Sequence, residues 1–333
     1  MMRPGQLTLS VALATYNGEQ FIREQLDSIV RQTYPPMEIV VCDDASTDAT
    51  VDVLQDFQEM FPEVVRLYRN VSNLGFIKNF EQAISLCTGD IIVLGDQDDV
   101  WLPCKLEKIV QVFLGLPEHG LVFTDAMVVD DKLMSLGYTI YLRHGKPDLR
   151  TGKTVPSLIR KTGVKGCTMA FRSKFREYVL PISTRQWGHD HWITFIMGVI
   201  SKIYFLNAPL MLHRRHEANL GNDPLLDKRF RRTARQICHN LSKDAYLQDY
   251  ERWFDMLEHL ESLRDKGGID FSKAVLEDGI AKTRDRVEFA RRRLYLRNRN
   301  RLSRTLPVIS LLLDGKYTRY ARGVRTLVKD LVA

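Results

Sequence analysis

The chain has 333 residues, 44% of them hydrophobic, which is enough apolar sequence for a large folded core and excludes a disordered protein. Its formal charge of +7 is unevenly divided. Residues 1–223 carry 23 Lys/Arg against 26 Asp/Glu, and residues 224–333 carry 25 against 15, so the net charges of the two parts are −3 and +10. We therefore expect one large domain over residues 1–223 and a basic appended region over residues 224–333.

The cysteines and the chain ends indicate the compartment. The five cysteines form no CxxC pair, which is typical of free thiols in a reducing environment. The N-terminal segment MMRPGQLTLSV lacks the cationic and apolar regions of a secretory signal. The apolar run from Leu306 to Leu313 is far shorter than the roughly 20 residues that cross a bilayer. We expect a cytoplasmic protein without a membrane-spanning helix.

The first 125 residues alternate short apolar runs with amphipathic stretches. The apolar runs have the length and branched side chains of buried strands: Leu7–Ala14, Glu38–Cys42, Val64–Tyr68, Ile91–Leu94 and Gly120–Thr124. The stretches between them have apolar residues at helical spacing: Glu19–Gln32, Ala49–Met60, Ile77–Cys87 and Lys105–Leu114. This alternation predicts an α/β fold with a parallel sheet covered by helices.

The rest of the chain falls into two further parts. Over residues 126–223, Gly, Pro and His interrupt shorter apolar runs, and we expect a second, acceptor-binding half of the large domain there. From residue 224 onward the pattern is mainly helical.

Polar side chains follow the predicted strands directly. The first strand is followed by Thr15, Tyr16, Asn17 and Gly18, the second by Asp43 and Asp44, the fourth by Asp96, Gln97, Asp98 and Asp99, and the fifth includes Thr124 before Asp125. Ligands of open parallel sheets bind at this carboxyl edge, where loop amides and helix N-termini converge. Several acids at one edge repel each other unless a cation neutralises them. Oxygen ligands favour Mg²⁺ or Mn²⁺, which often bind substrate phosphates as well.

Two common phosphate-binding loops are missing from the sequence. There is no GxxxxGK[ST] loop and no GxGxxG after the first strand, which argues against a P-loop nucleotidase and a dinucleotide-binding domain. A nucleoside diphosphate compound bound through its metal remains.

Three segments, SVALATYNG, EIVVCDDASTDAT and GDIIVLGDQDDVW, resemble in order and spacing the GT-A fold, family 2 glycosyltransferases. Three later segments resemble the bacterial branch that includes rhamnosyltransferases of cell-surface polysaccharides, such as O-antigen: GCTMAF, WGHDHW and HRRHEANLG. The resemblance covers about residues 7–222. It implies a GT-A catalytic domain, whose nucleotide-sugar-binding half is residues 1–125 and whose acceptor-binding half is residues 126–223.

The resemblance also implies roles for single residues. Asp44 would contact the nucleotide base. Asp96 would hold the ribose, and Asp98 would bind a Mn²⁺ or Mg²⁺ ion that bridges the diphosphate. The other implied nucleotide-sugar contacts are Thr15, Tyr16, Asn17 and His216. The implied metal ligands are Asp98, Asp96 and His216. Asp190 matches the downstream carboxylate of the family and would act as the catalytic base, whereas His189 stands where many relatives carry Glu.

These assignments suit a single displacement. A carboxylate at Asp190 can take the proton of an acceptor hydroxyl while the metal and nearby cations stabilise the departing nucleoside diphosphate. With no covalent intermediate, the product has the opposite anomeric configuration to the donor. The resemblance implies dTDP-rhamnose as a donor and a glycan or lipid-linked glycan as the acceptor.

Structural roles remain open for the same residues. The acids at Asp96–Asp99 and Asp190 could cap helices, and those at Asp43 and Asp44 could stabilise a turn. His216, which lies beside two arginines, could be a surface residue. Two other functions also remain open, a nucleotidyltransferase acting on a sugar phosphate and a non-catalytic protein that binds nucleotide sugars.

The basic C-terminal region has three interpretations. Residues 282–333 carry 15 Lys/Arg against 4 Asp/Glu, interleaved with apolar residues. This pattern favours peripheral contact with an anionic membrane, at the inner face of the cell membrane, over a solvated or oligomer-forming helix. Nucleic acid is the least favoured partner, because no nucleic-acid module precedes the basic run.

Overall fold

The structure is a computed structural model that describes residues 6–145, 148–149, 154–160, 164–186, 188–216, 243–266, 272–297, 301–321 and 323–332. The chain divides into two compact units. Unit 1 comprises residues 1–147 and 163–217, and unit 2 comprises residues 148–162 and 218–333. A short segment from the expected acceptor-binding half thus belongs to the helical unit. The expected boundary at residue 223 lies outside the described residues.

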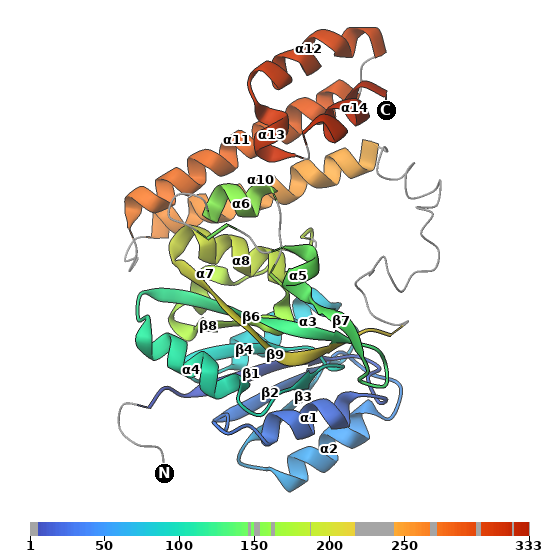
Figure 1. Cartoon of the computed structure of the whole chain (residues 1–333), viewed down its shortest axis with the longest axis vertical. Coiled ribbons are helices and arrows are strands. Elements are labelled where there is room, and N and C mark those ends of the chain that lie inside the picture. Colours follow the sequence, from blue (N-terminus) through green and yellow to red (C-terminus); the bar gives the residue numbers. More distant parts are fainter. Residues whose placement is uncertain are drawn as a thin grey trace. The chain divides into compact units, whose positions relative to one another are not determined.

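The N-terminal part of unit 1 alternates strands and helices as the sequence predicts (Figure 1). Each of these elements begins and ends within three residues of its expected bounds: β1 (Leu9–Thr15), α1 (Ile22–Val30), β2 (Glu38–Asp43), α2 (Thr50–Met60), β3 (Val65–Arg69), α3 (Phe76–Leu86), β4 (Ile91–Gly95) and α4 (Lys105–Gly115). The fifth predicted strand is longer than expected and forms β6 (His119–Val129).

The first four strands form a parallel sheet in the order β3-β2-β1-β4. Thr15 at the end of β1 is paired with Asp43 at the end of β2, and Leu13 is paired with Gly95 at the end of β4. The carboxyl ends of these three strands therefore lie next to one another. The polar residues that follow them are brought to one edge, as the sequence predicts.

Beyond β4 the sheet becomes mixed. Its other strands are β5 (Val100–Trp101), β7 (Ser135–Thr139), β8 (Met169–Arg172) and β9 (Lys202–Arg214). β8 is antiparallel to both β4 and β6, whereas β9 runs parallel to β6 and pairs with β5. The pairing of Trp101 with Met211 brings the end of β9 beside the loop that follows β4.

The remaining short elements of unit 1 are α5 (Ile140–His144), η1 (Gly166–Thr168), η2 (Ser173–Phe175), α7 (Arg176–Val179) and α8 (His189–Ile200). Every residue of α8 is buried except Asp190, which is half-buried. A helix that is apolar nearly all round belongs in a protein core. The one acid in its first turn is thereby set apart from its neighbours.

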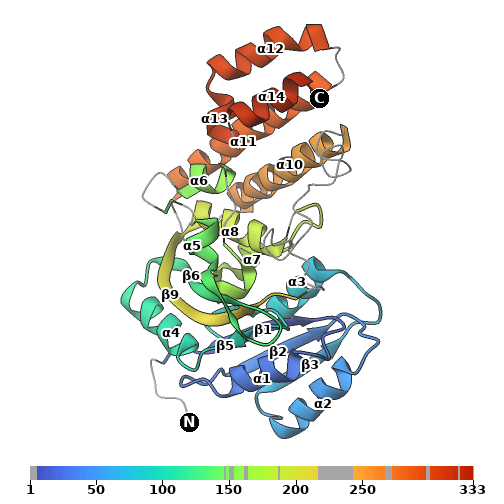
Figure 2. The same cartoon turned by 45° about the vertical axis from the view of Figure 1, so that its right-hand side comes forward.

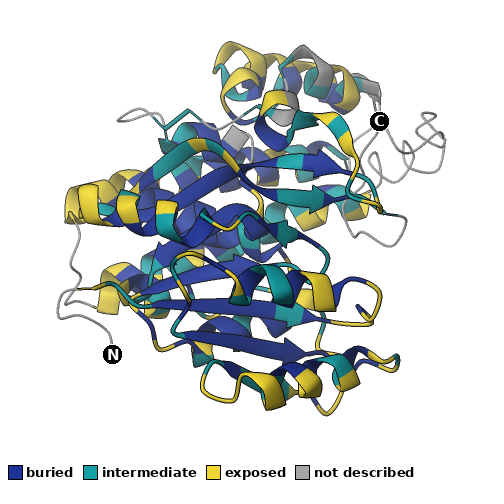
Figure 3. Ribbon diagram, turned by 60° about the horizontal axis from the view of Figure 1, so that its bottom comes forward, coloured by how far each residue is buried: buried dark blue, intermediate teal, exposed yellow. Residues whose placement is uncertain are grey.

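The central strands are buried on both faces. All residues of β2 and β4 are buried, and Figure 3 shows these strands in dark blue with yellow on the outward faces of the helices. Parallel strands covered on both sides by helices have continuous apolar sequences, as EIVVC and IIVLG do here. This rigid core fixes the positions of the loops at the sheet edge.

Unit 2 is entirely helical in the residues described, as the sequence predicts for the C-terminal region. Its helices are α6 (Thr154–Arg160), α10 (Lys243–Lys266), α11 (Lys273–Arg297), α12 (Arg301–Leu313), α13 (Lys316–Tyr320) and α14 (Val324–Val332). The long helices α10 and α11 pack against each other, α12 packs against α13 and α14, and α6 contacts α11 and α13.

A buried carboxylate connects four helices of unit 2. Asp330 of α14 accepts hydrogen bonds from Tyr246 Oη of α10 at 2.7 Å and from Tyr317 Oη of α13 at 2.8 Å. The guanidinium of Arg293 in α11 donates two more, at 2.7 and 2.9 Å. A second buried pair, Arg286 with Asp249, links α11 to α10. Part of the excess basic charge is therefore used inside unit 2.

Within the described ranges, no helix combines the length and the apolar character needed to cross a bilayer. Cys42, Cys87, Cys104 and Cys167 are all free thiols. Cys238 lies outside the described residues.

We predict that Asp330→Asn destabilises unit 2 strongly, because Arg293 then loses its buried counter-charge. Breaking a buried ion pair from one side costs about 3–5 kcal/mol. Urea denaturation followed by circular dichroism measures the loss. Asp314→Asn is the control, because Asp314 is half-exposed and lies 4.0 Å from its partner Arg292. Equal stability of the two variants would contradict the role of Asp330.

Candidate functional site

The loop after β2 is held by its own acids. Asp43 is fully buried, and its carboxylate accepts hydrogen bonds from Thr15 Oγ1 at 3.0 Å and from the Ser46 amide at 2.9 Å. Asp44 accepts from Asn70 Nδ2 and from two loop amides, at 2.8 to 2.9 Å. Both acids thus have the structural roles that the sequence left open. Thr15 and Asp44 lie at the expected edge with side chains already engaged by the protein.

The loop after β1 presents Tyr16 and Asn17. Tyr16 is 46% exposed, and Asn17 has a positive φ of 47°, a conformation that Asn tolerates better than most residues. Asn17 Oδ1 accepts a hydrogen bond from the Thr47 amide at 2.9 Å, which joins the loops after β1 and β2.

Gln97 joins the loop after β1 to the loop after β4. Its side chain accepts from the Tyr16 amide at 2.8 Å and donates to the Tyr16 carbonyl at 3.0 Å. A Cβ on Gly18 would lie 2.3 Å from Gln97 Oε1, so a larger residue there would displace the Gln97 side chain. The sequence singled out Gln97 only as the middle residue of a DxD motif.

The loop after β4 gathers three carboxylates. Oxygen atoms of Asp96, Asp98 and Asp99 all lie within 4.8 Å of one another. Burial, followed by the charges of Asp99 and Asp98, raises the pKa of Asp96 to about 7. Asp99 is fully buried, and its Oδ2 has no hydrogen-bond partner among the described residues. A hard divalent cation binds carboxylate oxygens that lie close together and relieves the repulsion between them. The cluster, which includes the unpartnered Asp99 Oδ2, therefore fits Mg²⁺ or Mn²⁺.

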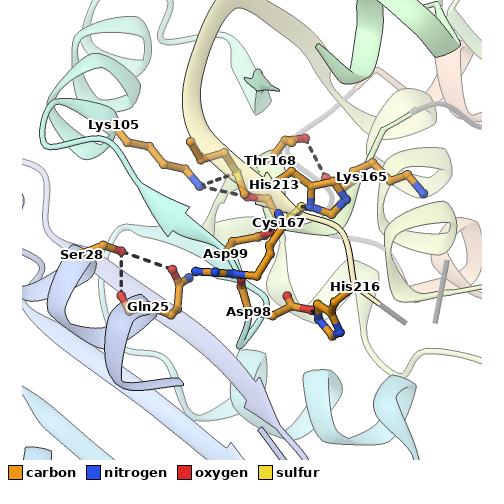
Figure 4. A network of polar contacts seen from close by, with 12 residues as sticks. Gln25, Ser28, Asp98, Asp99, Lys105, Lys165, Cys167, Thr168, His213 and His216 are labelled. Atoms are coloured by element: carbon orange, nitrogen blue, oxygen red, sulfur yellow. Dashed lines mark hydrogen bonds and ion pairs between the residues drawn. The ribbon is translucent and has the colours of Figure 1, made fainter. Parts of the chain in front are cut away.

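Two histidines at the end of β9 lie against this cluster (Figure 4). His216 Nε2 is 2.9 Å from Asp98 Oδ2, and His213 Nδ1 is 2.9 Å from Asp99 Oδ1. Burial lowers the pKa of His213, but the charge and hydrogen bond of Asp99 together with the charges of Asp96 and Asp98 outweigh it, and the net pKa is raised. His216 thus lies next to Asp98. The rest of the HRRHEANLG segment, from residue 217, lies outside the described residues.

Arg214 binds the backbone of the loop after β4, which we call the acidic loop. It is 2% exposed, and its Nε donates to the Asp98 carbonyl at 2.8 Å while its amide donates to Asp99 Oδ1 at 3.1 Å. The guanidinium also binds the Asp131 carbonyl and the Glu24 carboxylate and lies 4.5 Å above the Phe21 ring. Arg214 therefore acts on the loop rather than on a ligand, which the sequence did not reveal.

A buried lysine at the start of α4 supports the same region. Lys105 Nζ donates to the Cys167 carbonyl at 2.9 Å and lies 3.7 Å from the centre of the Trp101 ring (Figure 4). Burial lowers its pKa to about 8. Lys105 thus fixes η1, within the GCTMAF segment, to α4.

Asp190 lies at the first turn of α8. Its Oδ1 accepts the His191 amide at 2.7 Å, and a Cβ on Gly188 would lie 2.6 Å from that oxygen. The Asp190 charge also contributes to the raised pKa of Asp96, so the two carboxylates share one electrostatic environment. The residue before it, His189, is buried with its ring 3.8 Å from that of Phe80, and burial lowers its pKa to about 4. Trp187 of the WGHDHW segment lies outside the described residues.

One acid at a strand end lies apart from this cluster in its bonding. Asp125 lies inside β6, where its carboxylate accepts from Thr139 Oγ1 at 2.6 Å and from the Tyr141 amide at 3.2 Å. It joins β6 to β7 and α5. The fifth strand continues past the residue at which the sequence predicted its end.

The model of "Glycosyl transferase family 2" matches residues 10–179, which span β1 to α7 and contain the acidic loop. The match covers more than half of the chain. The chain belongs to this family.

Curated relatives agree with that membership. A protein of Nostoc named uncharacterized glycosyltransferase alr2836 is 29% identical over 64% of this chain and 66% of its own length. The dTDP-rhamnosyl transferase RfbG of Shigella flexneri is 27% identical over 62% of this chain and 72% of its own length. An uncharacterized Mycobacterium tuberculosis protein, Rv1520, is matched over 62% of its length. The chain thus spans a little under two thirds of the Nostoc and Mycobacterium relatives.

Solved structures establish the fold. Staphylococcus aureus TarS residues 1–349, in complex with UDP, superposes with a TM-score of 0.55 at 15% identity over 84% of this chain and 71% of TarS. The same fragment in complex with UDP-GlcNAc gives 0.56 at 16% identity over 83% and 71%. Unit 1 has the GT-A fold, followed by a helical C-terminal region.

The raised pKa of Asp96 predicts a pH-dependent gain in stability for Asp96→Asn. The folded protein holds the Asp96 proton more tightly than the unfolded chain, because the pKa rises from 3.8 to about 7. The wild-type protein therefore loses stability as the pH rises from about 4 to about 7, and the variant does not.

Thermal unfolding in EDTA at pH 5 and pH 8 tests this prediction. The variant should melt at least about 2 °C above the wild type at pH 8, with a smaller difference at pH 5. Asp52→Asn on the exposed side of α2 is the control. A difference that is the same at both pH values would show that Asp96 carries no shifted proton.

Proposed function

We propose that this chain is an inverting, metal-dependent glycosyltransferase that moves a sugar from a nucleoside diphosphate to a hydroxyl of a glycan or lipid-linked acceptor. The observation that carries the proposal is the gathering of Asp96, Asp98 and Asp99 at the carboxyl edge of a GT-A sheet in a family 2 chain. Family membership favours glycosyl transfer over the nucleotidyltransferase reading. An intact acid cluster favours catalysis over simple binding.

Asp98, Asp96 and His216 are our proposed metal ligands. When bound, a Mn²⁺ or Mg²⁺ ion neutralises the diphosphate and stabilises the charge that develops on it as the sugar leaves. His216 Nε2 lies 2.9 Å from Asp98 Oδ2, so the two side chains lie close enough to contribute to one metal site. Arg214 holds the backbone of the acidic loop through the Asp98 carbonyl and joins it to the turn after β6 through the Asp131 carbonyl.

We propose that the nucleotide is bound by Thr15, Tyr16, Asn17 and Asp44. The exposed ring of Tyr16 can cover a base or ribose. Asp44 Oδ2 accepts the Gly75 amide at 2.9 Å, and the second lone pair of this carboxylate oxygen can accept an N–H of a pyrimidine base. Thr15 supports this arrangement indirectly through Asp43.

Asp190 is proposed as the general base. It takes the proton of the acceptor hydroxyl as that oxygen forms a bond to the anomeric carbon and the bond from this carbon to the diphosphate oxygen breaks. The acceptor oxygen thus attacks from the side opposite the leaving group, and the configuration inverts. Gly188 and the His191 amide fix the carboxylate, and the half-buried position leaves it accessible.

The finer substrate assignment rests on relatives. RfbG of Shigella flexneri is named a dTDP-rhamnosyl transferase, and we propose dTDP-rhamnose as the donor and a cell-surface polysaccharide precursor as the acceptor. TarS binds UDP and UDP-GlcNAc, which supports a pyrimidine nucleotide.

We predict that Asp98→Ala and Asp190→Asn separate donor binding from turnover. Asp190→Asn should lower kcat by about 10²- to 10⁴-fold while donor binding stays within about twofold of wild type, because only proton removal is lost. Asp98→Ala should weaken donor binding in Mn²⁺ and abolish transfer. Glu177→Gln, at an exposed acid of α7, is the control for the loss of a charge. Near wild-type turnover by Asp190→Asn would refute the assignment of the base.

A donor panel measured by thermal shift tests the proposed substrate. A ligand that binds the folded state raises the melting temperature, by an amount that grows with its concentration over Kd. We expect dTDP-rhamnose with Mn²⁺ to raise it more than UDP-, GDP- or CMP-sugars do, and EDTA to remove the rise. A larger rise with another nucleotide sugar would overturn the donor, and indifference to EDTA would overturn the metal dependence.

A further inference from the structure

Helix α12 of unit 2 is apolar on two opposite faces. Val308 and Leu311 are buried, on the face that packs against α13 and α14. Leu306, Ile309 and Leu313 are 79%, 43% and 81% exposed. Residues three, four and seven apart share one face of an α-helix, so these three side chains form a continuous outward stripe. We call it the α12 stripe.

The α12 stripe differs from the ordinary exposure of single apolar residues. Scattered exposed leucines are common on protein surfaces, whereas a row along one helix usually marks a contact surface. Leu312, 44% exposed, widens the row toward one side. Figure 2 shows α12 at the rim of unit 2, with α13 and α14 on its inner side. The stripe thus faces away from the helices that α12 packs against.

The segment that contains the stripe is strongly basic. Residues 282–333 carry 15 Lys/Arg against 4 Asp/Glu, a net charge of +11. All four acids, Asp285, Glu288, Asp314 and Asp330, are paired with basic residues of the same unit. Arg291 of α11 and Arg319 of α13 have side chains 66% and 59% exposed. The segment therefore combines a net positive charge with the exposed leucines of α12.

We propose that the α12 stripe docks on an anionic lipid surface, with Leu306, Ile309 and Leu313 inserted among the acyl chains and basic residues of the segment 282–333 on the headgroups. An exposed apolar helix face within a strongly basic segment is typical of an interfacial helix. A second copy of the chain is the weaker candidate, because two surfaces of the same strong positive charge repel each other. Nucleic acid would use the charge but leave the leucines exposed.

Docking goes beyond the proposed sugar transfer, because it depends on α12 and not on the acidic loop of unit 1. Docking would bring the proposed transferase close to an acceptor carried by a lipid. The test uses lipid alone, so a failure to bind lipid would not affect the proposed sugar transfer. A protein that binds lipid but transfers no sugar would refute the transfer and leave the docking intact.

Co-sedimentation of the full-length chain with vesicles tests the docking. One set of vesicles is phosphatidylcholine alone, and the other contains about one third phosphatidylglycerol. We expect wild-type protein to pellet with the anionic vesicles, at least about tenfold more than with the neutral ones, and to be released in part by high salt. Equal recovery in the supernatant with both vesicle types would overturn the proposal without any variant.

The double variant Leu306→Glu with Leu313→Glu tests the stripe itself. Each lost leucine should weaken partitioning roughly tenfold, so the double variant should bind about 100-fold less. The matched control is Leu247→Glu with Val275→Glu, which changes two exposed apolar residues of α10 and α11 to the same acid. If the first pair misfolds by circular dichroism, Leu306→Ser with Leu313→Ser replaces it.

Two results would assign the stripe differently. Unchanged vesicle binding by the Leu306 and Leu313 variants would place the lipid contact elsewhere. A wild-type dimer in sedimentation velocity that these variants convert to monomer, without vesicle binding, would make the stripe an interface between copies.

Discussion

Repulsion among the carboxylates of the loop after β4 is the constraint around which unit 1 is organised. Three acids with oxygens within 4.8 Å of one another cannot all be charged at low cost, and burial together with the charges of Asp99 and Asp98 raises the pKa of Asp96. The fold opposes this repulsion with basic groups from one strand, since His213, Arg214 and His216 of the β9 end all bind the loop or its acids. The cost that remains is what a divalent cation relieves.

The same constraint explains why distant parts of the chain must fold together. The parallel strands bring Asp96–Asp99 to the sheet edge, but His213 and Arg214 reach them only because β9 runs beside β6 and pairs with β5. Gln97 ties the acidic loop to Tyr16, and Asn17 ties that loop to Thr47. The proposed nucleotide and metal contacts therefore belong to loops that are tied to one another, which suits a reaction that depends on positioning.

The sequence predicted the first half of the fold well because its signals are local. Buried strands such as Ile91–Gly95 have continuous apolar runs, and parallel strands place following acids at one edge. It did not predict that Arg214 grips the Asp98 carbonyl, because 116 residues separate them and only the mixed half of the sheet brings them together. The sequence also did not predict that residues 148–162 belong to unit 2, because the sequence of α6 does not indicate which helices it packs against. For Asp43 and Asp44 the sequence left a turn-stabilising role open, but it could not name their partners, because the loop amides that bind them carry no sequence signal.

The central claim is that the acids at this edge hold a divalent cation together with a nucleoside diphosphate. Anomalous diffraction at the manganese edge, from crystals grown with Mn²⁺ and dTDP or UDP, measures it most directly. The account predicts a single strong peak at the Asp98 carboxylate that also touches the diphosphate, and its loss in Asp98→Ala crystals. Nucleotide bound at the β1 and β4 ends with no manganese at Asp96 or Asp98 would contradict it.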